Sequence, residues 1–386
     1  RNIQKKKSYN FINLRLFNKF KLFLISFLMP KNYLGILPDD HNLQKFILKI
    51  KKKYNFKSIV YFNNNKVNFL KKKIYYLFPI FKVSELLFLD NKKDLNIKKK
   101  IENILNNKTN LIIEDKRFSY LLDIYLNNFL SIYLNNLSRK SENLYKFFKK
   151  NKPKLIIAKR SSDTAYSIGE ISRKLNFDSI LVSHASHIYN KNKLSMFDWT
   201  INSKSTINSD YKFVASQSKF SDEFLNKINV KSKILKTGPL ILTSPPDTYV
   251  KTDNNKYKII LHASTPKNIS NFRAINYETT YDYIENLKQQ IIALKDKKNV
   301  HFIIKFREYD FLRLNDFKYL MPKTKNFEID TKSNLKDLLE RCDYLSSYSS
   351  TVIEEALYFG KDIILYDKNG LEFRYLVSSC NVYSTE

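Results

Sequence analysis

The pattern of hydrophobic and polar positions is clearest between residues 153 and 238, where it predicts alternating strands and helices. The apolar run "PKLIIAKR" is typical of a buried strand, "SDTAYSIGEISRKLN" has the polar start and apolar spacing of a helix, and "DSILVSHASH" indicates a second strand. The strand "YKFVASQ", the helix "SKFSDEFLNKIN" and the strand "SKILKTGP" follow. Such a β-α-β-β-α-β series is typical of a doubly wound parallel sheet.

A second series of the same kind begins at residue 257. It follows the segment "ILTSPPDTYVKTDNNK" (241–256), whose Pro-Pro pair and polar residues predict a linker. Strands are expected in "YKIILHAST", "VHFIIKFRE", "NFEID", "YLSSY" and "DIILYD", with helices over 276–295, in "SNLKDLLERC" and in "STVIEEALYFG". We therefore expect an α/β protein with two Rossmann-like, doubly wound parallel-sheet domains, an N-terminal one over 1–240 and a C-terminal one over 257–386.

The first 150 residues are expected to extend the N-terminal domain. Short apolar runs such as "FKSIVYF", "KIYYLFPI", "SELLFLD" and "TNLIIED" predict strands between Lys/Asn clusters. The spacing of apolar residues over 119–150 predicts one long helix or two successive helices.

The net charge of +31 lies almost entirely in the N-terminal part. Residues 256–386 hold 20 Lys/Arg against 18 Asp/Glu, so the first 255 residues carry +29. This asymmetry indicates that the N-terminal domain meets a polyanion, either an anionic lipid surface or nucleic acid. The abundance of Lys, Asn, Ile, Tyr and Phe is typical of AT-rich genomes and accounts for part of the positive charge. Such a bias would, however, add positive charge to both parts of the chain alike.

Cysteine content and hydropathy indicate the cellular compartment and the relation to the membrane. The chain has two cysteines, Cys342 and Cys380, so a disulfide framework or thiolate metal site is not indicated and a reducing cytosol is expected. No run reaches the roughly 18 apolar residues that a membrane-spanning helix needs. The ten residues "KLFLISFLMP" (21–30) fit either an interfacial anchor or a buried segment.

Candidate chemistry lies where the strands of the second series end, because ligands of open parallel sheets bind beyond the carboxyl ends of strands. A hydroxyl-rich helix start suits a phosphate group, and two carboxylates one turn later suit the hydroxyls of a ribose. The expected donor-nucleotide residues are Ser264, Thr265, Lys305, Arg307, Ser349, Ser350, Thr351, Glu354 and Glu355. The alternative is an ordinary helix cap with an acidic first turn and no ligand.

Residues from about 150 to 370 resemble the GT-B glycosyltransferases. "SSYSSTVIEEALYFGKDIILYD" is similar to the strand-helix-strand of that fold's donor domain, with Glu355, and Glu354 second, at the ribose position. "VKSKILKTGP" resembles the end of the acceptor domain. "ILVSHASH" resembles a strand and His-Gly turn of bacterial surface-carbohydrate transferases and CDP-glycerol glycerophosphotransferases, although Ala185 replaces the usual glycine. "IIKFRE" departs from the Lys-Pro-His-Pro-like ending of many relatives.

The resemblance implies two domains facing across a cleft and a metal-independent, nucleotide-sugar-dependent glycosyltransferase without a cofactor. His184 is the first candidate for the base and His187 the second, with Asp163 as a further base or acceptor contact and Arg160 as an acceptor contact. Structural histidines or, with less support, metal ligands are the alternatives for the His pair. The resemblance also implies closing helices beyond residue 386, so the C-terminal domain is expected to be truncated.

The expected partners are a nucleotide-sugar donor, a glycan or lipid-linked acceptor, and an anionic membrane surface. The protein is then cytoplasmic and peripheral at the inner face of the plasma membrane. Transfer of a polyol phosphate from a CDP-alcohol and epimerisation of a UDP-sugar are alternatives on the same fold. A basic nucleic-acid-binding protein is the alternative from another class, but no helix-turn-helix, zinc-finger or RNA-binding signature supports it, so no nucleic acid is expected.

Overall fold

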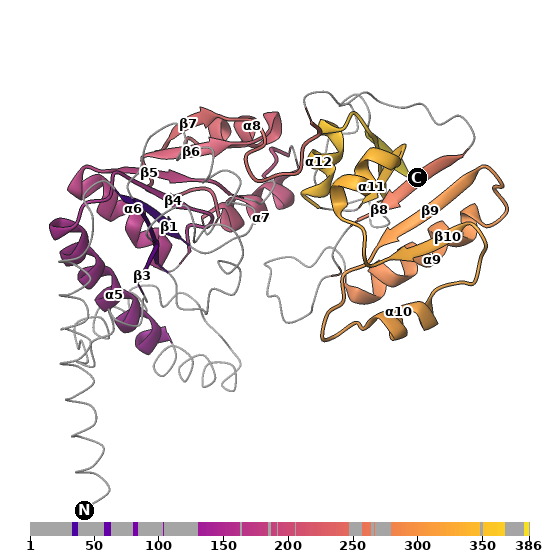
Figure 1. Ribbon diagram of the computed structural model, residues 1–386, viewed down its shortest axis with the longest axis horizontal. Coiled ribbons are helices and arrows are strands. Elements are labelled where there is room, and N and C mark those ends of the chain that lie inside the picture. Colours follow the sequence, from indigo (N-terminus) through magenta and orange to yellow (C-terminus); the bar gives the residue numbers. More distant parts are fainter. Residues whose placement is uncertain are drawn as a thin grey trace, which may run out of the picture. The chain divides into compact units, whose positions relative to one another are not determined.

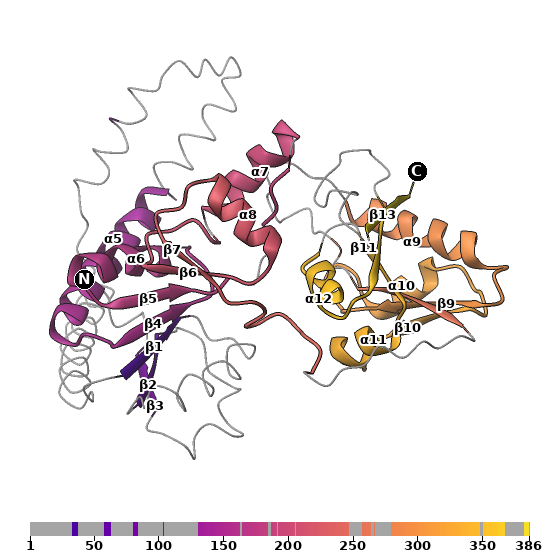
Figure 2. The same cartoon turned by 90° about the horizontal axis from the view of Figure 1, so that it is seen from above.

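The structure, a computed structural model, describes residues 33–37, 58–62, 80–83, 103, 130–162, 164–183, 187–190, 192–204, 206–246, 257–263, 266, 279–347, 350–366 and 382–385. Figure 1 and Figure 2 show the arrangement of its helices and strands. The apolar segment over 21–30 lies outside the described residues.

The N-terminal strands form a sheet of seven strands in the order β3-β2-β1-β4-β5-β6-β7. Its strands are β1 (Tyr33–Leu37), β2 (Ser58–Phe62), β3 (Ile80–Val83), β4 (Leu155–Ala158), β5 (Asp178–Leu181), β6 (Phe213–Ser216) and β7 (Lys233–Lys236). Neighbours from β3 to β6 pair in parallel. The helices of this part are α5 (Ser131–Lys150), α6 (Thr164–Leu175), α7 (Lys193–Ser203) and α8 (Lys219–Lys227).

Helix α6 shows why the spacing of apolar residues predicted a helix in this part of the chain. Its residues Ile168, Ile171 and Leu175 recur at helical spacing and are all buried, whereas the intervening Glu170 is exposed. Arg173, in the last turn of the helix, connects it to the segment before β6, because its guanidinium donates to the carbonyls of Asp210 and Tyr211.

Helix α7 is a difference from the sequence-based prediction, which placed no helix between β5 and β6. These two strands pair in parallel, and a parallel pair requires a crossover connection. The helix has the sequence "KLSMFDWTINS", with Asp198, Trp199 and Ser203 buried. Polar and apolar residues are therefore mixed on its buried side, and this mixture obscures the helical pattern.

The C-terminal strands form a second parallel sheet of six strands in the order β10-β9-β8-β11-β12-β13. The strands are β8 (Lys258–His262), β9 (Val300–Lys305), β10 (Phe327–Asp330), β11 (Tyr344–Ser347), β12 (Asp362–Tyr366) and β13 (Val382–Thr385). All neighbouring pairs are parallel. The helices are α9 (Thr280–Leu294), α10 (Leu314–Leu320), α11 (Leu335–Arg341) and α12 (Val352–Tyr358). The sequence pattern indicated neither α10 nor β13.

Helices cover both faces of this second sheet (Figure 2). On one face Leu261, Ile303 and Leu345 pack in a core with residues of α11 and α12. On the other face the neighbouring strand residues Phe302 and Ile304 pack in a core with α9 and α10. Because successive strand residues alternate between faces, the two cores confirm a doubly wound sheet.

The chain divides into two compact units. The first comprises residues 1–182, 207–214 and 231–233, and the second comprises 183–206, 215–230 and 234–386. The segments that follow β5 and β6 therefore belong to the second unit. The predicted domain limits, with a linker over 241–256, stay predictions, since residues 247–256 lie outside the described part. Among the described helices, none has the length and apolarity needed to cross a bilayer.

Candidate functional site

The strand order of the second sheet reverses between the central strands β8 and β11. The chain places β9 and β10 on one side of β8 and then returns to place β11, β12 and β13 on the other. Ligands of such sheets bind beyond the carboxyl ends of the two strands at the reversal. At this edge lie His262 at the end of β8, Ala263 directly after it, and Ser347 at the end of β11. Of the predicted nucleotide residues, Lys305 ends β9 and Ser350 and Thr351 follow β11, at this same carboxyl edge of the sheet.

Ser346 and Ser347 serve opposite faces of strand β11. Ser346 Oγ donates a hydrogen bond of 2.5 Å to Gln290 Oε1 on α9. Ser347 faces the α11 and α12 side, is fully buried, and has no hydrogen-bond partner for its hydroxyl among the described residues. A buried hydroxyl without a partner is costly, so a ligand or water that reached Ser347 Oγ would gain a hydrogen bond.

Two predicted phosphate contacts, Ser350 and Thr351, lie directly before helix α12. Ser350 Oγ accepts a hydrogen bond of 3.3 Å from the backbone N–H of Val352. Thr351 makes no side-chain cap hydrogen bond. One of the two hydroxyl oxygens thus contributes to an ordinary helix start, as in the alternative interpretation, and the other does not.

The carboxylates of Glu354 and Glu355 are both buried in the first turn of α12, with 2% and 8% of the residues exposed. Glu355 Oε1 accepts a hydrogen bond of 2.6 Å from the backbone N–H of Thr243. Burial raises the pKa of Glu355, the Thr243 hydrogen bonds lower it, and the neighbouring charge of Glu354 raises it. Acidic side chains are seldom buried, so two buried glutamates in one helical turn single out the start of α12 as a candidate site.

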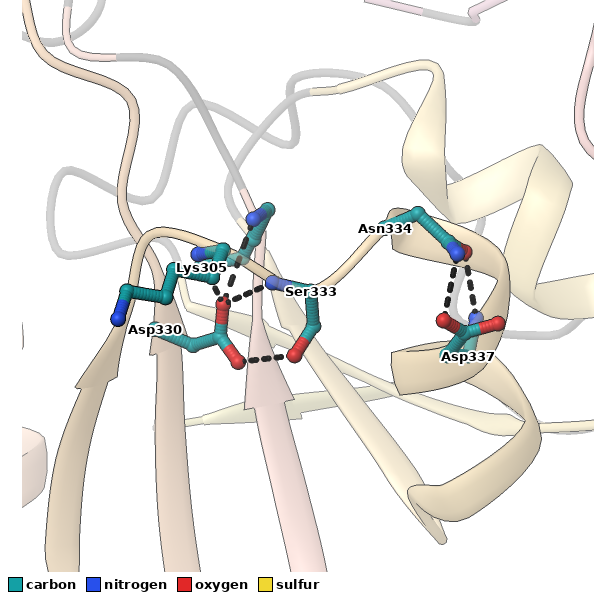
Figure 3. A network of polar contacts seen from close by, with 6 residues as sticks. Lys305, Asp330, Ser333, Asn334 and Asp337 are labelled. Carbon is teal, nitrogen blue, oxygen red and sulfur yellow. Dashed lines mark hydrogen bonds and ion pairs between the residues drawn. The ribbon is translucent and has the colours of Figure 1, made fainter.

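The basic side chain Lys305 lies at the end of β9 and forms an ion pair with Asp330 at the end of β10, with 3.4 Å between Nζ and Oδ1 (Figure 3). Asp330 also accepts hydrogen bonds from the backbone N–H groups of Lys332 and Ser333 and from the Ser333 hydroxyl. Arg307, the other predicted basic contact, is exposed. A phosphate at Lys305 would therefore compete with an existing carboxylate partner.

The first sheet has its own reversal, between β1 and β4. Arg160 follows β4 at this edge and is exposed, as an acceptor contact would need to be. Its neighbour Lys159 is buried, and burial, followed by the charge of Arg160, lowers the pKa of Lys159 to about 8. The sequence interpretation did not select Lys159, although its place at the end of the "PKLIIAKR" strand was visible.

His187 has the surroundings of a structural histidine. It is 1% exposed, and its ring packs against the rings of Trp199 and Phe224. Its Nε2 lies 2.6 Å from Thr206 Oγ1, and the Thr206 hydroxyl donates to the carbonyl of Asn202. Because a hydroxyl has one proton, Thr206 accepts from His187, whose Nε2 then carries a hydrogen. This geometry favours the structural alternative for His187.

Five of the predicted site residues lie outside the described residues and stay predictions: Asp163, His184, Ser264, Thr265 and Ser349. Within the described part of the chain, no group of three or more His, Cys, Asp or Glu side chains could hold a metal ion. The structure thus brings Ser350, Thr351, Glu354 and Glu355 together at one helix start, with Lys305 two strands away from β11.

No protein-family model and no curated protein sequence matches the chain. Solved structures do match it. A protein from Listeria monocytogenes assigned as a UDP-N-acetylglucosamine 2-epimerase aligns with 87% of this chain and 79% of its own, with 11% identity and a TM-score of 0.51. Another UDP-N-acetylglucosamine 2-epimerase aligns with 88% of this chain and 80% of its own, with 12% identity and a TM-score of 0.50. At such identities the likeness shows the fold, and this chain has the α/β GT-B-like fold with two Rossmann-like parallel sheets.

Proposed function

We propose that the chain is a glycosyltransferase that moves a sugar from a nucleotide-sugar donor to a surface polysaccharide or a lipid-linked acceptor. The observation that carries the proposal is the buried pair Glu354 and Glu355 at the start of the helix that follows the strand reversal. Burying two carboxylates at one helix start is costly, and carboxylates at this place are suited to accept hydrogen bonds from the hydroxyls of a ribose.

The donor nucleotide is assigned to the carboxyl edge of β8 and β11. Glu355 accepts from the ribose hydroxyls, with Glu354 second, and the hydroxyls of Ser350 and Thr351 contact the phosphates. Lys305 supplies a charge to the departing phosphate once it exchanges Asp330 for the ligand. The predicted contacts Ser264, Thr265, Arg307 and Ser349 complete the site in this proposal.

The transfer step needs one base. The acceptor hydroxyl oxygen forms a bond to the anomeric carbon, the bond from that carbon to the nucleotide phosphate oxygen breaks, and the acceptor proton passes to the base. His184 is assigned this role, because Nε2 of His187 is already hydrogen-bonded to the hydroxyl of Thr206. Asp163 is the second candidate and Arg160 an acceptor contact.

Epimerisation of a UDP-sugar is the second candidate function. It is favoured by the fold likeness to two proteins named as UDP-N-acetylglucosamine 2-epimerases. Those names also make UDP the first nucleotide to test. Transfer of a polyol phosphate from a CDP-alcohol requires CDP in the same site, so the nucleotide distinguishes it.

The binding test is a thermal-shift screen with UDP, CDP, CMP and GDP on wild type, Glu355→Ala and the control Glu285→Ala. Glu285 lies on α9, on the other face of the same sheet, in an ion pair with Lys288. Ligand at about 100 times its dissociation constant stabilises a protein by roughly 2.7 kcal/mol. We expect one nucleotide to raise the melting temperature of wild type and Glu285→Ala but not of Glu355→Ala. No response to any nucleotide in wild type would overturn the proposal.

The reaction test separates transfer from epimerisation. Purified protein is incubated with UDP-N-acetylglucosamine alone, and the products are followed by proton NMR. An epimerase forms a second UDP-sugar without releasing UDP, whereas a transferase leaves the donor unchanged until an acceptor glycan is added and then releases UDP. Formation of an epimer without acceptor would replace the transferase proposal by the second candidate.

Membrane association is proposed from the +29 charge of the first 255 residues. Such a surface binds anionic lipid with an affinity that falls as salt screens it. Flotation with vesicles of phosphatidylserine and phosphatidylcholine tests this, with pure phosphatidylcholine as the control. Salt-sensitive retention of DNA or RNA in a gel shift, without nucleotide binding, would instead support the nucleic-acid alternative.

A further inference from the structure

Helix α7 buries polar side chains and exposes apolar ones (Figure 2). Its buried side chains are Asp198, Trp199 and Ser203. Asp198 Oδ2 accepts a hydrogen bond of 3.0 Å from Asn202 Nδ2, and Ser203 Oγ donates one of 2.7 Å to the carbonyl of Thr200. Both polar side chains of the buried side therefore have partners within the helix itself.

The exposed side of α7 carries four residues, which we call the α7 stripe. Phe197 and Ile201, one turn apart, are 58% and 41% exposed, and Lys193, one turn before Phe197, is exposed as well. With 3.6 residues per turn, these three positions fall within an arc of about 80° on the helix surface. The fourth member, Lys204, is exposed and continues the last turn, since its N–H donates to the carbonyl of Ile201.

The stripe faces outward because the opposite side of α7 is packed. The ring of Trp199 lies against that of His187, with 5.7 Å between centroids, and His187 in turn lies against Phe224 on α8, at 5.5 Å. All three rings belong to the second compact unit. A rotation of α7 that buried Phe197 would expose Trp199 and break these contacts, so the exposure of the stripe follows from the packing of the helix.

The charge of the stripe favours an anionic partner. The only acidic residue in the sequence of α7 is Asp198, which is 1% exposed, so the lysines at the two ends of the stripe meet no exposed carboxylate from their own helix. Lysine side chains can extend their apolar stems along a lipid surface and keep the ammonium group among the headgroups. An apolar pair between two lysines thus has the chemistry of a helix that lies in the interface of an anionic bilayer.

The size of the apolar pair argues against a protein partner. An aromatic side chain buries roughly 150–250 Å² at most, whereas a stable protein–protein interface takes about 800 Å² from each partner. Phe197 and Ile201, each partly covered already, supply only a small part of that area. A bilayer makes no such demand, because two side chains that reach its acyl boundary add to the electrostatic attraction of the lysines.

We propose that the α7 stripe is a membrane-contact surface, which inserts Phe197 and Ile201 into an anionic lipid bilayer and places Lys193 and Lys204 among its headgroups. The inference rests on the proposed function in that an anionic membrane is the partner. It goes further by naming the residues that make the contact and by requiring hydrocarbon as well as negative charge.

The first measurement uses the full chain and no donor. Flotation with vesicles of phosphatidylserine and phosphatidylcholine, and with pure phosphatidylcholine, compares wild type with two stripe variants, Phe197→Ser/Ile201→Ser and Lys193→Gln/Lys204→Gln. We expect the partition coefficient on anionic vesicles to fall about tenfold or more in each. The matched controls should stay within about twofold of wild type; they are Tyr319→Ser/Leu320→Ser, at exposed apolar positions of α10, and Lys297→Gln/Lys298→Gln, at exposed positions after α9.

The second measurement tests insertion and keeps an aromatic side chain, so it holds if a serine variant fails to fold. Trp199 is the only tryptophan of the chain and is buried. In Phe197→Trp, anionic vesicles should shift the added emission to shorter wavelength, and lipids brominated on their acyl chains should quench it. Tyr319→Trp should show neither effect. An unshifted, unquenched Phe197→Trp would overturn the proposal.

Other outcomes would also overturn it. Stripe variants that float as well as their controls would place the lipid contact elsewhere, and equal flotation with pure phosphatidylcholine would remove the preference for negative charge. Loss of a dimer in light scattering, or of a nucleic-acid gel shift, in the stripe variants with vesicle binding unchanged would assign the stripe to that partner instead.

Nucleotide binding separates this inference from the proposed function. Both stripe variants should bind UDP within about twofold of wild type, because none of the four residues belongs to the proposed donor site. If wild type binds no UDP while the flotation and emission results hold, the glycosyltransferase proposal fails and the membrane surface stands. If UDP binds and the stripe variants float like wild type, the membrane surface fails alone.

Discussion

Glu355 Oε1 lies 2.6 Å from the backbone nitrogen of Thr243, a residue 112 positions earlier in the chain. The carboxylate assigned to the ribose therefore has a protein partner in the structure described here. A ribose hydroxyl that binds Glu355 must share the carboxylate with this N–H group or replace it. In the proposed site, donor binding would thus be coupled to the position of the chain after β7 through one side chain.

Glu355→Ala removes the acceptor of the Thr243 N–H group. We expect a loss of about 1–3 kcal/mol in the free energy of unfolding, because a part-buried donor is left without its partner. Glu355→Gln keeps an acceptor of the same shape and should lie within about 1 kcal/mol of wild type. Urea unfolding at pH 7 measures the free energy of unfolding of both variants. Equal losses in the two would show that the hydrogen bond to Thr243 does not account for the loss.

The pH dependence of stability should also depend on Glu355. Its pKa in the folded protein is raised above the ordinary 4.5, so the folded state holds its proton to higher pH than the unfolded chain does. The free energy of unfolding contributed by this group therefore falls as pH rises from 4.5 through the folded pKa, and then stays constant. The difference between wild type and Glu355→Gln, measured by urea unfolding from pH 4.5 to 8, should fall in this way. A flat difference would contradict the raised pKa.

Gly169 allows helix α6 to approach the segment before β6. A Cβ at this position would lie 2.9 Å from the backbone nitrogen of Tyr211 and 3.0 Å from the carbonyl carbon of Asp210, both of which are backbone atoms. We expect Gly169→Ala to lose about 1–3 kcal/mol, although alanine is the better helix former. Glu170→Ala, one position along on the exposed side, is the control and should be nearly neutral. Chemical unfolding of the two variants decides the point.

The parallel strands could be predicted because burial on both faces leaves apolar runs in the sequence. "KIILH" of β8, "VHFIIK" of β9 and "DIILY" of β12 are such runs, and the structure has strands at each. Helix α7 could not be predicted in the same way, because its buried positions include Asp198 and Ser203. The pattern of hydrophobic and polar positions does not predict a helix whose buried positions mix polar and apolar residues.

The candidate site was predictable in its location more than in its contacts. The end of β11 and the first turn of α12 are contiguous in sequence, so Ser350 and Glu355 could be selected together. Their partners could not be predicted from the sequence. Thr243 contacts Glu355, and Asp330 contacts Lys305, only after the fold has brought separate segments together.

Asp330 should control both acid stability and the availability of Lys305. Burial alone would raise the pKa of Asp330, but hydrogen bonds from Ser333, Lys332 and Lys305 lower it below the ordinary 3.8. Stability from this group is therefore present above pH 3.8 and is lost as pH falls through the folded pKa. Asp330→Asn should lose about 1–3 kcal/mol at pH 7 and show less acid dependence below pH 3.8 than wild type. Acid titration of unfolding measures both.

The same substitution tests whether Lys305 serves a phosphate. Without the Asp330 carboxylate, the Lys305 ammonium group no longer has a charged partner at 3.4 Å and is released to a competing anion. If Lys305 contacts the donor phosphates, Asp330→Asn should bind UDP about threefold to tenfold more tightly than wild type, a gain that falls with added salt. Asp296→Asn, at an exposed position after α9, is the control for the lost negative charge. Calorimetric titration with UDP decides the role: equal affinities for wild type and both variants would leave Lys305 as a structural partner of Asp330, and the phosphate charge would then have to come from another residue such as Arg307.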